Sequence, residues 1–359
     1  MTPNPTPGDP AERGGGLLAL TMGEPAGIGP DITLGAWMQR ASARLPAFVV
    51  FGSRAALGER AVMLGLSVPI ETVATADAAR AVWDAGRLPV IDIALARPVE
   101  AGKPDPGNGA AVIAAIERAT ADVMAGRACA LVTNPIAKSV LYAAGFAHPG
   151  HTEFLAALAG KADGGATVIP VMMLVAPQLR VVPLTIHIPL ADVPRAISGV
   201  AIETAARIMA ASLVLDFGIA RPRIAVAGLN PHAGESGGLG REEIEIITPA
   251  IAALAAQGLD ITGPLSADTM FHAAARARYD AALCMYHDQA LIPIKTLAFD
   301  DGVNVTLGLP FVRTSPDHGT AFDIAGHGHA RPASLIAALR LAAAMAARRR
   351  AGGATSTSR

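Results

Sequence analysis

Three histidines in this sequence stand where the ends of buried strands are expected. His187 follows the apolar run "VVPLTI", His232 follows "RIAVAGLNP", and His287 follows "AALCMY". Because the carboxyl ends of parallel strands meet at one edge of a sheet, the three imidazoles could converge there. Three neutral imidazoles with one open position suit Zn²⁺ or another borderline divalent ion. The pattern therefore predicts a metal site, in which Asp288 and Glu235 either orient imidazoles or simply begin helices.

The spacing of the histidines limits how such a site could form. His232 lies 45 positions after His187 (232 minus 187), and His287 lies 55 positions after His232 (287 minus 232). These intervals are too long for a local metal motif, so only the fold or a subunit interface could bring the imidazoles together. One such histidine alone would more often be a structural residue at a strand end.

A second group of polar residues suits a phosphate. Lys295, Asn304 and Arg313 flank the nearly uncharged run "VNVTLGLPFV". Arginine can hold a phosphate with two parallel hydrogen bonds, whereas lysine acts as a point charge. The alternative is that the three residues lie on a solvated loop. The run between them is almost uncharged, which is not typical of such a loop and favours polar side chains that face a cleft. His151 and Thr152 precede the apolar helix "FLAALAG", where Thr152 could equally contact substrate or cap the helix.

The elements that would position these residues alternate between two patterns. Short runs rich in Val, Ile and Leu, such as residues 17–21, 47–52 and 128–133, are followed by Ala-rich helical segments, and a long helix is expected over 332–348. This alternation predicts an α/β protein with parallel strands and crossover helices. Two Gly-rich loops, 22–31 and 229–240, match neither the Walker nor the Rossmann glycine pattern and are weak signals by themselves.

Composition excludes several classes of protein. With 359 residues, 52% hydrophobic and only 16% charged, the chain can bury a large core in two domains. A net charge of -1 without a basic stripe argues against nucleic acid. The mean hydropathy is +0.40, but the apolar stretches are interrupted well before the roughly 18 residues that a membrane span needs. No secretory signal opens the flexible-looking leader, so we expect a cytoplasmic protein with a fraying basic tail over 348–359.

Long motifs give a more specific indication. The segments "GEPAGIGPD", "TNPIAKSVL", "GHTEF", "LNPHAGE", "GPLSADTMF", "MYHDQALIPIK" and "GVNVTLGLPFVRTSPDHGTAFDIAG" resemble the 4-hydroxythreonine-4-phosphate dehydrogenase family, from about Leu17 to Ala346. The stretch "DHGTAFDIAG" also resembles the adenosine-binding loop of isopropylmalate and isocitrate dehydrogenases. The resemblance implies two α/β domains flanking a cleft, with no standard Rossmann fingerprint: 1–145 plus 320–359 with the nucleotide-binding loop, and 146–319 for metal, substrate and dimerisation.

The family's site residues can be carried over position by position. The metal ligands fall on His187, His232 and His287. The substrate contacts fall on His151, Thr152, Lys295, Asn304 and Arg313. The cofactor-binding residues fall on His318, Gly319, Thr320 and Asp323. For the group that removes the hydroxyl proton, Lys295 and Asp288 are both candidates.

The resemblance also implies a reaction. With NAD or NADP and one divalent ion (Zn, Mg or Co), such an enzyme oxidises 4-phosphooxy-L-threonine to 2-amino-3-oxo-4-phosphooxybutanoate. This β-keto acid loses CO₂ to give 3-amino-2-oxopropyl phosphate, a precursor of pyridoxine 5'-phosphate. A homodimer with a shared active site is implied as well. Related dehydrogenases of four-carbon sugar-acid phosphates or aromatic dihydrodiols, a trihistidine metallohydrolase and a non-catalytic metabolite-binding module are the alternatives.

Overall fold

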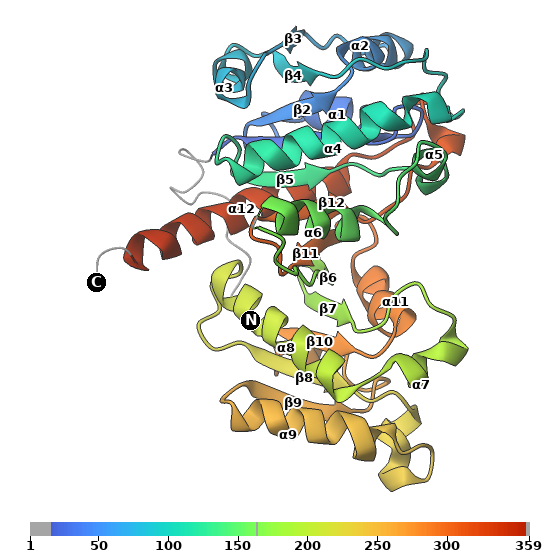
Figure 1. Cartoon of the computed structure of the whole chain (residues 1–359), viewed down its shortest axis with the longest axis vertical. Helices are drawn as coiled ribbons and strands as arrows, with labels where there is room; N and C mark the ends of the chain where they lie inside the picture. Colours follow the sequence, from blue (N-terminus) through green and yellow to red (C-terminus); the bar gives the residue numbers. More distant parts are fainter. Residues whose placement is uncertain (1–15, 163, 357–359) are drawn as a thin grey trace. The chain divides into compact units, whose positions relative to one another are not determined.

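The computed structural model describes residues 16–162 and 164–356, which divide into two compact units. Among the described residues, the terminal unit joins 16–170 with 309–356, and the middle unit is Val171–Gly308. Each unit combines a mainly parallel sheet with helices, as the α/β prediction requires (Figure 1). The predicted leader lies outside the described residues. The last helix, α12 (Ala333–Ser356), continues past residue 348, into the segment that was expected to fray.

The sheet of the terminal unit is entirely parallel. Its strand order is β3-β4-β2-β1-β5-β12, with β1 (Leu18–Thr21) central and paired in register with β5, so that Thr21 lies beside Thr133. The other strands are β2 (Phe48–Gly52), β3 (Ile70–Thr72), β4 (Leu88–Asp92), β5 (Ala130–Thr133) and β12 (Arg313–Pro316). Most of these strands are short, fully buried aliphatic runs, as expected when helices cover both faces of a parallel sheet.

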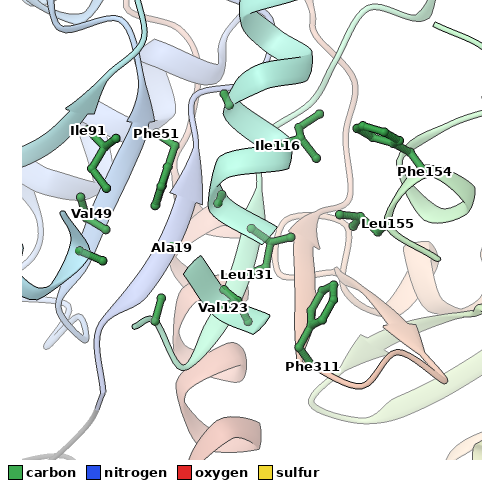
Figure 2. Packing of buried hydrophobic residues seen from close by; sticks show 14 of the residues in the cluster. Ala19, Val49, Phe51, Ile91, Ile116, Val123, Leu131, Phe154, Leu155 and Phe311 are labelled. Carbon is green, nitrogen blue, oxygen red and sulfur yellow. The ribbon is translucent and has the colours of Figure 1, made fainter. Parts of the chain in front are cut away.

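Helices pack on this sheet through a large aliphatic core. They are α1 (Gly29–Met38), α2 (Arg54–Met63), α3 (Ala76–Asp84), α4 (Gly109–Met124), α5 (Lys138–Ala143) and α6 (His151–Ala162), together with α12. Figure 2 shows Ala19 and Leu131 from the strands against Ile116 of α4, with Phe154 of α6 and Phe311 in the same cluster. Since α6 and Phe311 belong to this core, the units divide after Pro170 and Gly308, whereas the predicted domain limits lay after 145 and 319.

The sheet of the middle unit has the order β11-β6-β7-β10-β8-β9. Its strands are β6 (Val171–Ala176), β7 (Leu179–Pro183), β8 (Arg223–Ala227), β9 (Asp260–Leu265), β10 (Ala281–Cys284) and β11 (Val303–Leu307). Strands β7, β10, β8 and β9 are parallel, but β6 runs antiparallel to both its neighbours, which the sequence did not predict. Only Pro177 and Gln178 connect β6 to β7, and so short a link permits only an antiparallel hairpin.

The helices of the middle unit are α7 (Val193–Ala196), α8 (Gly199–Leu215), α9 (Thr248–Ala256), α10 (Ala273–Arg276) and α11 (His287–Leu297). Cys284 is buried among Tyr279, Leu291 and Ile294 in the core of this unit. Among the described residues no single helix is long and apolar enough to span a bilayer. The bent pair Leu190–Ala196 and Gly199–Leu215 meets the length and composition test only jointly.

Candidate active site

Two of the predicted metal histidines lie side by side in the middle unit. Strands β7 and β10 are parallel neighbours, and each leads into a segment that carries one imidazole: His187 after β7 and His287 at the start of α11. The two ring centroids are 5.9 Å apart. The segments are tied together by Thr185, whose hydroxyl donates to the carbonyl of Met285 over 2.8 Å. The fold thus pairs two imidazoles whose positions differ by 100 residues (287 minus 187).

Asp288 gives one of these imidazoles a defined orientation. Its Oδ1 lies 2.7 Å from Nδ1 of His287. A carboxylate in this position holds the proton on Nδ1 and leaves Nε2 as the atom that can coordinate a metal. Glu235, the other carboxylate considered for this role, makes no hydrogen bond to an imidazole among the described residues.

The third histidine lies on an unusual backbone. His232 belongs to η4 (Pro231–Gly237), where five successive residues from His232 to Ser236 all have positive φ; His232 itself has φ 53° and ψ 29°. His187 also has a positive φ, 51°. Each non-glycine residue in this left-handed region costs about 1–2 kcal/mol. Such strain persists only where surrounding contacts compensate for it, and it is concentrated at functional sites.

Several of the predicted substrate-binding residues lie in the terminal unit. Arg313, at the start of β12, is 3% exposed, and its Nη2 donates to the hydroxyl of Thr133 over 2.6 Å. Burial lowers the pKa of Arg313 to about 10, and the nearby Glu153 carboxylate counteracts part of this effect. His151 opens α6, and its Nε2 is buried without a hydrogen-bond partner among the described residues. Burial, and then the positive charges of Arg313 and Lys138, hold the pKa of His151 well below its usual value.

These groups have complementary chemistry. A buried guanidinium favours an anion, and a neutral imidazole with an unused Nε2 can exchange a hydrogen bond with one. Lys138, in the first turn of α5, adds a second cation. Lys138 was not among the predicted site residues, although it lies within the family motif "TNPIAKSVL". Thr152 is the second residue of α6, inside the first turn, so it does not occupy the capping position.

Lys295 and Asn304 belong to the middle unit, whereas Arg313 belongs to the terminal unit. Lys295 lies in the last turn of α11, and its Nζ is 5.7 Å from the centroid of the Phe299 ring. Asn304 lies in β11, and its Oδ1 is buried without a hydrogen-bond partner among the described residues. An amide oxygen in this state is available to a ligand donor.

The loop predicted to bind the cofactor packs against the first Gly-rich loop. The carbonyl of Thr320 accepts a hydrogen bond of 2.9 Å from the amide of Ile28. Gly27 allows this approach, because a Cβ there would lie 2.9 Å from the same carbonyl oxygen. His318 has a buried Nε2 with no hydrogen-bond partner among the described residues. No atom lies within 4 Å of the position that a Cβ on Gly319 would occupy. Asp323 lies in the short turn η6 (Phe322–Ile324).

A buried ion pair fastens the two loops to each other. Arg60 of α2 bonds to Asp31 of α1, and its two Nη atoms also donate to the carbonyls of Gly27 and Pro25. The other oxygen of Asp31 accepts from the amide of Gly326 over 2.8 Å. The sequence did not single out Arg60, because an arginine inside a helix carries no signal of burial.

Comparison with known proteins identifies the family. The model of the family described as "Pyridoxal phosphate biosynthetic protein PdxA" matches residues 44–342. A 4-hydroxythreonine-4-phosphate dehydrogenase of Bradyrhizobium diazoefficiens is 59% identical over 338 residues, covering 92% of this chain and 97% of the relative. The chain belongs to the PdxA family. The family and the enzyme class predicted from the motifs are thereby confirmed.

Solved PdxA structures and one related enzyme have the same fold. The 4-hydroxythreonine-4-phosphate dehydrogenase of Klebsiella pneumoniae superimposes with a TM-score of 0.80 at 37% identity, covering 94% of this chain and 99% of that one. A terephthalate 1,2-cis-dihydrodiol dehydrogenase of Burkholderia xenovorans gives 0.61 at 29% identity, covering 92% and 98%. The predicted α/β fold class is therefore confirmed.

The fit of this PdxA chain to a metal ion can be judged from its donors. His187 and His287 supply a neighbouring pair of imidazoles, and Asp288 bonds to one of them. Within residues 16–162 and 164–356, however, no group of three or more His, Cys, Asp or Glu side chains is arranged to hold an ion. Two of the three predicted ligands thus lie close together, and the third lies on the strained turn η4.

Proposed function

We propose that this chain oxidises 4-phosphooxy-L-threonine with NAD or NADP and that the product decarboxylates to 3-amino-2-oxopropyl phosphate. The observation that carries the proposal is the 59% identity, over 92% of the chain, to a relative named for this activity. The buried pair of Arg313 and a neutral His151 supports it, because the substrate carries a phosphate. We assign the phosphate to Arg313, the neighbouring polar groups of the substrate to His151 and Thr152, and further contacts to Lys295 and Asn304.

The oxidation removes one hydride and one proton from the substrate, each to a different acceptor. A hydride leaves the carbinol carbon for the nicotinamide ring, which becomes NADH or NADPH, while a base takes the hydroxyl proton. Asp288 already bonds to His287, so we assign it to orientation and leave Lys295 as the base. We assign the cofactor to His318, Gly319, Thr320 and Asp323, on the loop that Arg60 and Asp31 help to fasten.

The product of oxidation is a β-keto acid, which favours loss of CO₂. The electrons of the broken carbon–carbon bond move into the ketone to form an enolate, and protonation of the adjacent carbon gives the amino ketone phosphate. Lys295 would offer a positive charge near the developing oxyanion. A divalent ion held by His187, His232 and His287 would supply Lewis-acid polarisation of the same oxygen.

We also propose a cytoplasmic homodimer with a shared active site. One described chain pairs only two of the predicted ligands, and a third ligand from a partner subunit would complete three. The structure leaves several apolar side chains beside the predicted ligands exposed, including Ile188, Leu190 and Ile292. Contact with a second copy would remove this apolar surface from water.

The test is the appearance of NADH or NADPH absorbance with a panel of substrates. We expect turnover with 4-phosphooxy-L-threonine and formation of CO₂ in equal amount. The comparison substrates are four-carbon sugar-acid phosphates and an aromatic cis-dihydrodiol. Faster turnover of a sugar-acid phosphate would show that this compound is the preferred substrate. Turnover of the dihydrodiol alone would show that the substrate carries no phosphate. Hydrolysis without cofactor reduction would favour a metallohydrolase, and tight binding without any turnover would favour a metabolite-binding module.

A further inference from the structure

A buried amide joins the segments that carry two of the histidines. Gln289, in the first turn of α11, is 8% exposed. Its Oε1 accepts from the amide of Met285 over 2.7 Å, and its Nε2 donates to the carbonyl of Gly228 over 2.7 Å. Met285 lies two residues before His287, and Gly228 lies four residues before His232. The side chain therefore spans from one histidine-bearing segment to the other.

The same junction includes the segment that carries His187. The carbonyl of Met285 accepts from the hydroxyl of Thr185, which lies two residues before His187. Both backbone groups of Met285 are thus used, one by Thr185 and one by Gln289. A shift of any one of the three segments would break at least one buried hydrogen bond, at a cost of about 1–3 kcal/mol.

Beyond Gly228, a buried carboxylate holds the strained turn. Glu243 begins the π-helical turn η5 (Glu243–Ile247) and is 3% exposed. Its Oε1 accepts from the amide of Asn230 over 2.7 Å, and its Oε2 accepts from the side-chain amide of Asn230 over 2.9 Å. A Cβ at Gly234 would lie 2.6 Å from Oε2, so the turn closes tightly on the carboxylate. These charge-assisted bonds offset the left-handed strain at His232.

We infer that Gln289 is a positioning residue for the predicted metal ligands: it fixes the loop that presents His232 and the helix that presents His287, and so holds each histidine in place for an ion shared between subunits. The inference rests on the proposed function, because it assumes that these histidines bind an ion. Gln289 suits this role because one side chain must accept from Met285 and donate to Gly228 at once. Removing a group that is hydrogen-bonded to a metal ligand typically lowers metal affinity by about ten- to a hundredfold. Gln289 acts through the backbone that carries the ligands, and we expect the lower end of this range.

The test compares Gln289→Met with a matched control. Methionine keeps the length of the side chain and loses both hydrogen bonds. Asn108 is a buried side-chain amide of the terminal unit that also makes two hydrogen bonds to backbone groups. It accepts from the amide of Arg97 over 2.9 Å and donates to the carbonyl of Arg97 over 3.2 Å. Asn108→Leu therefore removes an equivalent pair far along the chain from the histidines. Both variants should lower the melting temperature.

The measurement is the dissociation constant of Co²⁺ for the full-length protein, by calorimetric titration and by the absorption of the bound ion. We expect Gln289→Met to weaken Co²⁺ binding at least about tenfold, while Asn108→Leu binds as the wild type does. Equal affinity in Gln289→Met and the wild type, or an equal loss in both variants, would overturn the positioning role and leave the metal site standing. No binding by the wild type would overturn the metal site itself and the role of Gln289 with it.

Should Gln289→Met fail to fold, Gln289→Glu provides the second variant. Glutamate has the same size and can still accept from Met285, but in its ionised form it cannot donate to Gly228. A Co²⁺ affinity at least about tenfold weaker in this variant supports the role. Unchanged affinity contradicts it.

Discussion

The proposed anion site of the terminal unit and the proposed histidine site of the middle unit are built in different ways. Arg313 lies in a regular strand, and a neighbouring strand end supplies its partner Thr133. His187 and His232, in contrast, lie on loop backbone with positive φ, and only two of the three histidines are paired. The first site is formed by the sheet itself. The second depends on buried contacts outside the ligands and, on the proposed function, on the ion and a partner subunit.

Removing a predicted metal ligand should give the largest effect. We expect His232→Ala to lower kcat by more than about a hundredfold, with the melting temperature nearly unchanged because the side chain is exposed on a loop. Affinity for inorganic phosphate should stay at the wild-type value, since the anion site lies in the other unit. Ser236→Ala, on the same left-handed turn, is the matched control and should retain activity. Wild-type metal content and activity in His232→Ala would contradict the trihistidine site.

The anion site should respond to a change of cation geometry. Arg313→Lys keeps the charge but replaces a planar fork by a point charge. Catalytic efficiency on the phosphorylated substrate should fall by about ten- to a hundredfold, or about 1.4 to 2.7 kcal/mol, as expected for a lost charged hydrogen bond. The dephosphorylated analogue, a poor substrate from the start, should react at nearly the same rate as before. An equal loss on both substrates would mean that Arg313 is scaffold.

A glycine substitution measures how tightly the strained turn is held. Gly234→Ala adds a Cβ at φ 78° that would lie 2.6 Å from the Glu243 carboxylate. Gly145→Ala is the control, since Gly145 has φ 85° and nothing within 4 Å of a Cβ. The control should lose about 1–2 kcal/mol of unfolding free energy from conformation alone, and Gly234→Ala about 1–3 kcal/mol more from overpacking. Urea unfolding measures both, and equal losses would show that Glu243 does not confine the turn.

The smallest effect is expected at Glu24, on the Gly-rich loop of the terminal unit. Burial raises the pKa of this carboxyl, and a hydrogen bond from the amide of Ala26 opposes the shift. A raised folded-state pKa means that the folded protein holds the proton more firmly, so this contribution to stability falls as pH rises from the ordinary carboxyl pKa to the raised one. Glu24→Gln should remove that part of the pH dependence.

Melting temperatures measured from about pH 4 to 8 would test this expectation. Above the raised pKa, the Glu24→Gln variant should be at least as stable as the wild type. Lower stability of the variant throughout this range would show that the ionised carboxylate of Glu24 is favourable where it lies.

The strands that precede the candidate site residues could be predicted because they belong to a repeating pattern. His187, His232 and His287 each follow an apolar run, and the structure confirms those runs as β7, β8 and β10. The contacts around them could not be predicted in the same way. Gln289 looks like any polar residue in the first turn of a helix, and only the pairing of β8 with β10 places Gly228 opposite its amide.

By itself the sequence determined the α/β class, the family and the residue types at the site. Alternating aliphatic and Ala-rich segments indicate strands and helices from neighbouring residues alone. The long motifs indicate the family but do not give the positions of their residues in space. The tertiary structure decided that α6 and Phe311 join the core of the terminal unit, that β6 runs antiparallel, and that His232 lies on left-handed backbone. The physical reason is the distance along the sequence over which each interaction acts. The periodicity of side chains depends on neighbouring residues. The left-handed turn, in contrast, is held by Glu243, which is buried against it 13 positions after Asn230.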